Sequence, residues 1–241
     1  MRKITLTFCF LLSYCLLPAQ IKFKGVGIFG AITQSAHFYK NNDTPNKDTT
    51  YKYTDFYPQT HISKEYFNWG AGAFVEFGGR GSTNWQTELE YTHSGAYEMG
   101  LANPYTGERT GSYVATKLTY IQWNNYLKFF YPLGIAKGYW MPGVRLEYLF
   151  KRSAGAYQDV INAFPTIWFS GDIGVGYEFP LFKKYSAFAE YHWNPDIIPH
   201  TYNSNTKVRS RTFELRVGIV MRPRKRAIDD CNAPVYKGPA Y

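Results

Sequence analysis

Short segments of alternating apolar and polar residues run through this chain from Lys22 onward, and the connections between them are alternately long and short. Successive side chains of a strand point to opposite faces, so each segment predicts a strand with one apolar and one polar face. Tyr, Phe and Trp make up 19% of the residues and gather near the segment ends. Together these features predict an all-β fold, an eight-stranded antiparallel up-and-down transmembrane β-barrel.

The connections predict which end of the barrel faces which side of the membrane. The predicted strands are residues 22–38, 68–78, 84–96, 115–131, 138–151, 166–182, 185–193 and 207–222. Three connections, 79–81, 132–137 and 183–184, are short turns, whereas 39–67, 97–113, 152–165 and 194–206 are long and polar. With an even number of strands both termini lie on the periplasmic side. The short turns are then periplasmic and the long loops are outward.

The first residues have the pattern of an export signal. Arg2 and Lys3 precede an apolar stretch that ends at Leu17, and the small residue Ala19 follows at a cleavage position. This pattern predicts a cleaved signal peptide over residues 1–19. An uncleaved anchor, which usually needs about 20 apolar residues, and a lipoprotein modified at Cys15 are the alternatives. The predicted domains are therefore 1–19 signal peptide, 20–222 outer-membrane β-barrel and 223–241 periplasmic tail, which places the protein in the cell outer membrane.

Charged residues fall on the face of the strands that is predicted to line the lumen. This set is Glu76, Glu88, Glu90, Lys128, Arg145, Glu147, Asp172, Glu178, Glu190, His192, Glu214 and Arg216. Charges enclosed in a narrow lumen need partners, so we interpret the set as a structural salt-bridge network. A catalytic or transport site is the alternative. A soluble sandwich with these charges outside and the Trp and Phe residues inside is the structural rival.

Glycines recur at predicted inward positions, where small residues make room for long ones. They are Gly25, Gly27, Gly70, Gly72, Gly174, Gly176 and Gly218. The interior of an eight-stranded barrel is just wide enough to be filled by side chains. We expect these glycines to lie opposite Arg, Lys and Glu side chains, so that the lumen is a plug and not a pore.

Few residues suggest chemistry. His192 and Asn194 have the spacing of the His-x-Ser arrangement of membrane-embedded lipid A deacylases, but Asn194 stands where the serine nucleophile would be. The sequence shows no metal-ligand cluster, phosphate-binding Gly loop or Cys-based site, so we predict no enzyme activity, no cofactor and no metal. Three other histidines, His37, His61 and His200, are expected to be solvated in or near the outer loops.

The chain is basic, with 27 Lys and Arg against 18 Asp and Glu. Behind a signal peptide this charge predicts anionic lipopolysaccharide or peptidoglycan-side partners rather than nucleic acid, for which no motif is present. Pro223 should end the last strand. The basic residues around it either hold anionic headgroups or dock a periplasmic protein, with a cysteine as a possible cross-link site: Arg222, Arg224, Lys225, Arg226 and Cys231.

Two segments resemble a known family. Residues 120–134 read YIQWNNYLKFFYPLG, and residues 86–96 read QTELEYTHSGA. They are similar to strands of the outer-membrane β-barrel family of Bacteroidetes-type bacteria that includes PorT-like proteins, although Gln122 and Asn124 stand where that family usually has Glu and Pro. The resemblance implies an eight-stranded barrel and, for some members, assistance to the type IX secretion machinery.

The function expected from the sequence is that of a non-enzymatic outer-membrane barrel, a structural or assembly component and an accessory of type IX secretion. Its expected partners are outer-membrane lipid and periplasmic or secretion-machinery proteins. The alternative is a porin-like or ligand-binding barrel with recognition loops, the longest of which is rich in aromatic residues. A lipid A-modifying enzyme is the third hypothesis.

Overall fold

The computed structural model describes residues 22–41, 60–78, 82–99, 113–153, 161–162, 164–196, 200–201 and 206–223. The predicted signal peptide, the turn 79–81, most of the four long loops and the tail residues Arg224, Lys225, Arg226 and Cys231 lie outside them. In the described part, no helix is long and apolar enough to cross a membrane.

The described residues form one antiparallel sheet that closes on itself. Its strands are β1 (Lys22–Asn41), β2 (Thr60–Ile62), β3 (Tyr66–Gly78), β4 (Thr83–Met99), β5 (Tyr113–Leu133), β6 (Ala136–Ser153), β7 (Ile167–Phe182), β8 (Tyr185–Pro195), β9 (His200–Thr201) and β10 (Thr206–Met221). Their order is β2-β1-β3-β4-β5-β6-β7-β8-β10-β9, and β1 also pairs with β10 from Val26↔Met221 to Asn41↔Thr206. This pairing closes the ring and confirms the predicted eight-stranded barrel, to which β2 and β9 are short additions.

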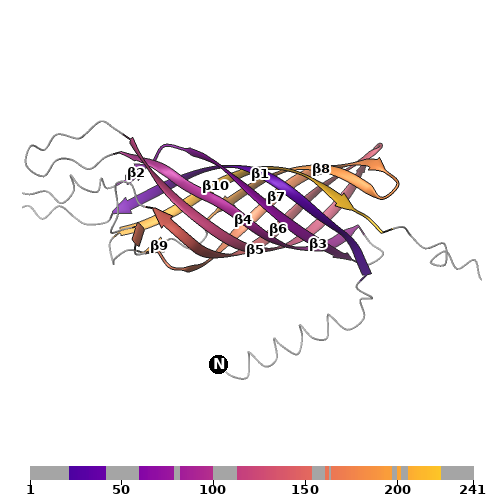
Figure 1. The fold of residues 1–241 in the computed structure, drawn as a ribbon, viewed down its shortest axis with the longest axis horizontal. Coiled ribbons are helices and arrows are strands. Elements are labelled where there is room, and N and C mark those ends of the chain that lie inside the picture. The colour runs from indigo at the N-terminus through magenta and orange to yellow at the C-terminus, as the bar shows by residue number, and fades with distance from the viewer. Residues whose placement is uncertain are drawn as a thin grey trace, which may run out of the picture.

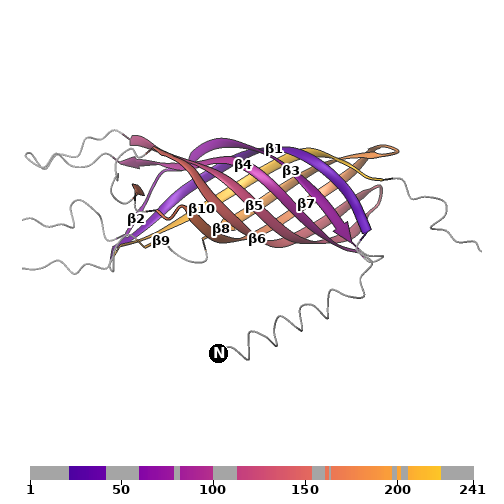
Figure 2. The same cartoon turned by 60° about the horizontal axis from the view of Figure 1, so that its bottom comes forward.

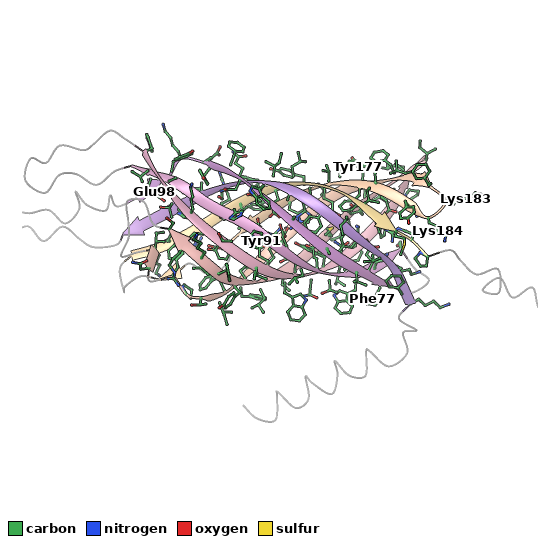
Figure 3. The ribbon with its side chains drawn as sticks, in the orientation of Figure 1. Phe77, Tyr91, Glu98, Tyr177, Lys183 and Lys184 are labelled. Atoms are coloured by element: carbon green, nitrogen blue, oxygen red, sulfur yellow. The ribbon has the colours of Figure 1, made fainter. Side chains whose placement is uncertain are left out.

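Both ends of the described chain lie at one end of the barrel (Figures 1 and 2). We call this the terminal end; β1 begins there at Lys22 and β10 ends there at Met221. Figure 3 shows Lys183 and Lys184, the turn between β7 and β8, at the terminal end, and Glu98 near the opposite end, the loop end. The positions of the termini and of this short turn agree with the predicted topology.

The turn between β5 and β6 is tighter than predicted. Pairing continues to Leu133↔Ala136, so two residues, Gly134 and Ile135, replace the expected turn over 132–137. Gly134 has φ of 63°, in the left-handed region that only glycine adopts without strain. A glycine with this φ at the first central position is typical of the two-residue hairpin turns that match strand twist.

The outer surface of the wall is apolar. On β10, Leu215, Val217 and Ile219 are 52%, 58% and 47% exposed, whereas Glu214 and Arg216 between them are buried. The apolar stripe runs from Phe213 to Met221. Its length matches the 9–11 residues of roughly 45° tilted strand that a bilayer core requires. Charges inside and aromatics outside exclude the soluble sandwich.

The alternation of faces is interrupted on β6. The pairing of β5 with β6 shifts register where Thr119 pairs with Lys151 and Tyr120 pairs with Leu149, so Phe150 is the extra residue of a bulge. Strict period-two counting therefore fails on β6 at that point.

The inward glycines make room mainly for aromatic rings, which corrects the expectation of Arg, Lys and Glu neighbours. A Cβ added to Gly27 would lie 2.4 Å from Phe74, one on Gly72 would lie 2.6 Å from Phe29, and one on Gly218 would lie 2.5 Å from Phe188. Gly70, next to Glu90, follows the original expectation. Phe29, Phe74 and Phe188 form one buried cluster that fills the lumen toward the terminal end.

Candidate functional site

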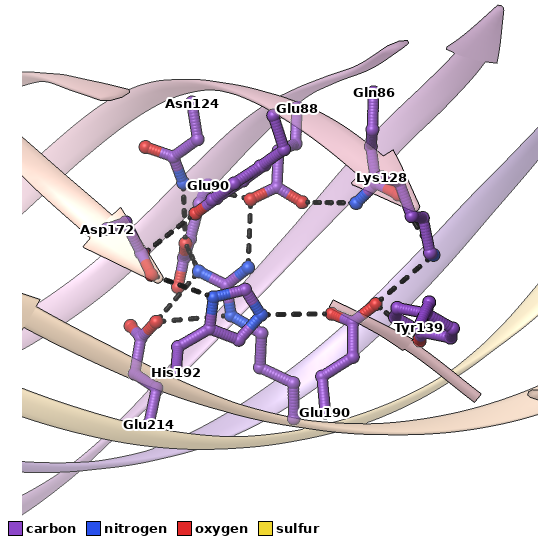
Figure 4. A network of polar contacts seen from close by, with 12 residues as sticks. Gln86, Glu88, Glu90, Asn124, Lys128, Tyr139, Asp172, Glu190, His192 and Glu214 are labelled. Atoms are coloured by element: carbon purple, nitrogen blue, oxygen red, sulfur yellow. Dashed lines mark hydrogen bonds and ion pairs between the residues drawn. The ribbon is translucent and has the colours of Figure 1, made fainter. Parts of the chain in front are cut away.

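The whole predicted inward polar set lies buried in the lumen. Its members are between 0% and 8% exposed: Glu76, Glu88, Glu90, Lys128, Arg145, Glu147, Asp172, Glu178, Glu190, His192, Glu214 and Arg216. They extend from strands β3 to β8 and β10, around most of the ring. Figure 4 shows that polar contacts join many of them into a single network.

Arg216 is the centre of this network. Its Nη1 donates to Glu88 Oε1 at 2.8 Å, and its Nη2 donates to Glu90 Oε2 at 2.6 Å. The Nε and Nη2 groups also donate to Glu214 Oε2, at 3.1 and 2.7 Å. The guanidinium lies 4.7 Å from the ring centroid of Phe29. One cation from β10 thereby binds across the lumen to two carboxylates of β4.

Asn124 completes the coordination of the two β4 carboxylates. Its Nδ2 donates to Glu88 Oε1 and to Glu90 Oε2, each at 3.1 Å. Asn124 is completely buried. A neutral amide therefore supplies donors where carboxylates outnumber cations.

Arg145 forms the second buried guanidinium centre. It pairs with Asp172 and, at 2.7 Å, with Glu214 Oε2, and it donates to Gln122 Oε1 at 3.2 Å. Tyr126 donates its hydroxyl to Asp172 Oδ2 at 2.9 Å. Since Glu214 binds both arginines, the two centres form one continuous cluster.

His192 lies between two carboxylates, as Figure 4 shows. Its Nδ1 is 3.1 Å from Asp172 Oδ1 and its Nε2 is 3.2 Å from Glu190 Oε2. Ionised carboxylates only accept hydrogen bonds, so an imidazolium that donates from both nitrogens fits this position. Neither nitrogen is then available to activate a nucleophile.

Lys128 links the network to the aromatic part of the lumen. Its Nζ donates to Glu76 at 3.0 Å, to Gln86 at 3.2 Å and to Glu190 at 3.4 Å. The ammonium also lies 3.8 Å from the ring centroid of Tyr139, whose hydroxyl donates to Glu190 at 2.7 Å. A single lysine thus contacts residues of β3, β4, β6 and β8.

Arg222 closes the polar network at the terminal end. It follows β10 rather than lying within the strand as predicted, and its Nη1 donates to Glu76 Oε2 at 2.6 Å. Its Nε donates to Glu178 Oε1 at 2.7 Å, and its Nη2 also contacts Glu178. The side chain therefore points into the lumen and is bound there, whereas the sequence suggested that it binds lipid headgroups or a partner protein.

An apolar layer lies inside the barrel at the loop end. Ile161 and Phe164, from a connection expected to be polar and outward, are buried against Leu118, Tyr120, Leu149 and Val208. Arg152 fixes this segment, because its Nη1 donates to the carbonyl of Asn162 at 2.6 Å and to that of Phe164 at 3.3 Å. Part of this loop is therefore a lid on the lumen.

Between this lid and the arginines lies a small polar pocket. Its cavity volume is about 20 Å³, and its lining includes Glu147, Asp196 and Glu214. Ser170 donates to Glu147 Oε1 at 2.8 Å. A cavity needs about 10–15 Å³ to hold one water molecule. This pocket therefore has room for water but not for a solute such as a sugar.

Asn194 also has a structural role. It stands where the His-x-Ser arrangement of lipid A deacylases has its serine. In the amide orientation that satisfies its hydrogen bonds, it donates to the carbonyl of Gly171 at 2.8 Å and accepts from Arg145 Nη1 at 3.2 Å. Its side chain thus supports β7 and the arginine centre.

One polar pair was missed from the sequence. His37, expected to be solvated, is completely buried, and its Nδ1 lies 3.1 Å from Glu98 Oε1. Both residues have the parity of the inward positions of their strands. His37 lies near the end of the predicted strand 22–38, and Glu98 lies beyond the predicted strand 84–96. His61 and His200 lie in β2 and β9, and their side chains are outside the described set.

The described residues contain no group of three or more His, Cys, Asp or Glu side chains placed to hold a metal ion. The acids and bases of the lumen are instead paired with each other. Their ion pairs and hydrogen bonds link the strands of the barrel to one another.

Searches with protein-family models and of curated protein sequences return no match. Several solved structures are similar to the chain, three of which are described here. Neisserial surface protein A has 11% identity over 81% of this chain and 97% of its own, with a TM-score of 0.42. The outer membrane protein OprG from Pseudomonas aeruginosa has 11% identity over 86% of this chain and 100% of its own, with a TM-score of 0.44. The third structure is Ail, the attachment invasion locus protein of Yersinia pestis, in complex with the heparin analogue sucrose octasulfate. It has 13% identity over 82% of this chain and 99% of its own, with a TM-score of 0.35. At these scores the fold rests on the strand register of the chain itself.

Proposed function

We propose that this protein is a non-enzymatic outer-membrane β-barrel whose lumen is sealed, and that it acts as a structural or assembly component of the membrane. The observation that carries this proposal is the filling of the lumen from end to end. The aromatic cluster with Arg222, the two-arginine network and the lid of Ile161 and Phe164 follow one another along the barrel axis.

Membrane location is supported by the inverted distribution of side chains. The wall exposes a continuous apolar surface that includes Ile28, Trp123 and Val217, at 66%, 53% and 58% exposure. Monomeric soluble proteins rarely expose apolar patches larger than a few hundred Å². A closed barrel leaves no unpaired strand edge in the hydrocarbon, which is the condition for a sheet to span a bilayer.

The absence of enzyme activity is proposed from the engagement of the lumen residues. Both ring nitrogens of His192 contact carboxylates, and the hydroxyls of Tyr126 and Tyr139 donate to carboxylates. A general base must have a free lone pair within reach of the proton that it removes. His192 offers none in this arrangement, which argues against the lipid A-modifying hypothesis.

A liposome-swelling assay tests the sealed lumen. The full chain, reconstituted into vesicles and diluted into an isotonic solution of a small sugar, should give the swelling rate of protein-free vesicles. A general porin of known size, reconstituted in parallel, is the positive control. Swelling that increases with the amount of this protein would support the porin-like alternative instead.

The resemblance of residues 86–96 and 120–134 to PorT-like barrels supports a finer proposal, that the protein assists type IX secretion. An affinity pull-down from detergent-solubilised outer membranes tests this, comparing the full chain with a version that ends at Arg222. Secretion-machinery proteins recovered only with the full chain would support the role. Equal and essentially empty recoveries would favour a stand-alone barrel.

A further inference from the structure

Three basic residues form a row on the outer wall at the loop end. Lys207, Arg209 and Arg211 alternate with inward residues of β10, and they continue the same outward face that is apolar from Phe213 to Met221. Lys207 and Arg209 are exposed and Arg211 is half-buried. We call these three residues the basic ladder. The ladder begins where the apolar stripe ends, at the level where lipid headgroups meet the hydrocarbon.

Arg211, the member of the basic ladder nearest the apolar stripe, is held against the barrel wall. The Arg211 guanidinium lies 5.1 Å from the ring centroid of Phe38 on β1 and 5.1 Å from that of Phe213. Contacts of this kind fix a guanidinium near a ring by cation–π attraction. Arg211 therefore presents a positioned charge rather than a freely moving one.

No carboxylate balances this charge within the described part of the chain. None of the ion pairs there involves Lys207, Arg209 or Arg211. Alternate residues of a strand are roughly 6.5–7 Å apart, so the three cations repel one another across a short distance. An anion placed between them would remove this repulsion, whereas the arginines inside the lumen are already neutralised by glutamates.

We propose that the basic ladder binds the phosphate group of an outer-leaflet lipid, namely the phosphorylated disaccharide of lipid A, whose acyl chains lie on the apolar stripe below. Guanidinium groups form two parallel hydrogen bonds with phosphate, so Arg209 and Arg211 suit this headgroup. The inference rests on the proposed membrane location, and it assigns a site to the lipid partner. It does not depend on whether the lumen is sealed.

The test compares two variants of the full chain that lose the same charge. Arg209→Gln/Arg211→Gln removes two rungs of the ladder, and Lys183→Gln/Lys184→Gln removes two exposed cations at the terminal end. Each protein, checked for β-sheet by circular dichroism, is titrated in zwitterionic detergent micelles with diphosphoryl lipid A, with dephosphorylated lipid A and with inorganic phosphate. All substituted side chains lie outside the lumen, so both variants should fold.

One cation beside an anionic lipid surface is worth roughly a factor of five in affinity, so the ladder variant should bind diphosphoryl lipid A roughly 25-fold more weakly. The terminal-end variant should bind diphosphoryl lipid A with the affinity of the unmodified protein. The unmodified protein should bind dephosphorylated lipid A weakly, with an affinity similar to that of the ladder variant for diphosphoryl lipid A. Equal affinity of both variants would overturn the proposal. So would displacement of lipid A by an equal concentration of inorganic phosphate, which would indicate a free-anion site. Neither result would alter the swelling test of the lumen.

Discussion

Replacing Arg216 by glutamine should strongly destabilise the barrel. The guanidinium is completely buried and donates four hydrogen bonds, at 2.6 to 3.1 Å, to Glu88, Glu90 and Glu214. These carboxylates are at most 2% exposed, so after the substitution they would face one another with little access to water. Removing one partner from a buried ion pair costs about 3–5 kcal/mol, and we expect Arg216→Gln to lie in this range.

The assay is equilibrium unfolding in urea, with the protein reconstituted in lipid vesicles under conditions where unfolding is reversible, followed by tryptophan fluorescence. Lys184→Gln is the control, because it removes the same charge from an exposed position in the turn between β7 and β8 and should change the free energy of unfolding by less than about 0.5 kcal/mol. Adding Glu88→Gln and Glu90→Gln to Arg216→Gln should restore part of the loss, since two buried charges are then neutral. If Arg216→Gln were as stable as its control, the structural interpretation of the network would be refuted.

Two further substitutions test the filling of the lumen. Gly27→Ala would place a methyl group 2.4 Å from Phe74, which should cost about 1–3 kcal/mol in the free energy of unfolding, whereas Gly30→Ala, with nothing within 4 Å of its Cβ, should cost nothing measurable. The same unfolding assay distinguishes them, and equal stabilities would contradict the packing described for the aromatic cluster. Arg222→Ala leaves Glu76 and Glu178 without their shared cation and should cost about 1–3 kcal/mol, whereas Lys184→Ala, in an exposed turn, should change stability by less than about 0.5 kcal/mol. A loss confined to Lys184→Ala would be inconsistent with closure of the lumen by Arg222.

Much of the architecture could be predicted because a barrel wall imposes a strict period of two on the sequence. Glu88 and Glu90, or Glu214 and Arg216, have the same parity and point to the same side, so the lumen set follows from the strand positions alone. The period does not show which carboxylate meets which cation. Arg216 on β10 contacts glutamates on β4, a pairing set by the diameter of the closed ring.

The remaining differences have local causes. His37 has inward parity within the predicted strand 22–38, but its place at the strand end favours a loop. Glu98 lies beyond the predicted strand 84–96, because the alternation of apolar residues fades before β4 ends at Met99. The inner aromatic cluster was missed because Phe74 looks the same in sequence whether it faces lipid or the lumen; only its parity with Glu76 indicates the inner side. The lid residue Phe164 lies in a connection with no strand pattern, so periodicity carries no information about it.

Ion conductance across a planar lipid bilayer tests the sealed lumen most directly, because it detects even narrow aqueous paths that exclude sugars. The full chain, inserted at high salt, should leave the membrane at its background conductance over a wide range of voltages. Discrete conductance steps whose number grows with added protein, and whose size changes in Arg216→Gln, would show that ions pass through the network and would contradict the account.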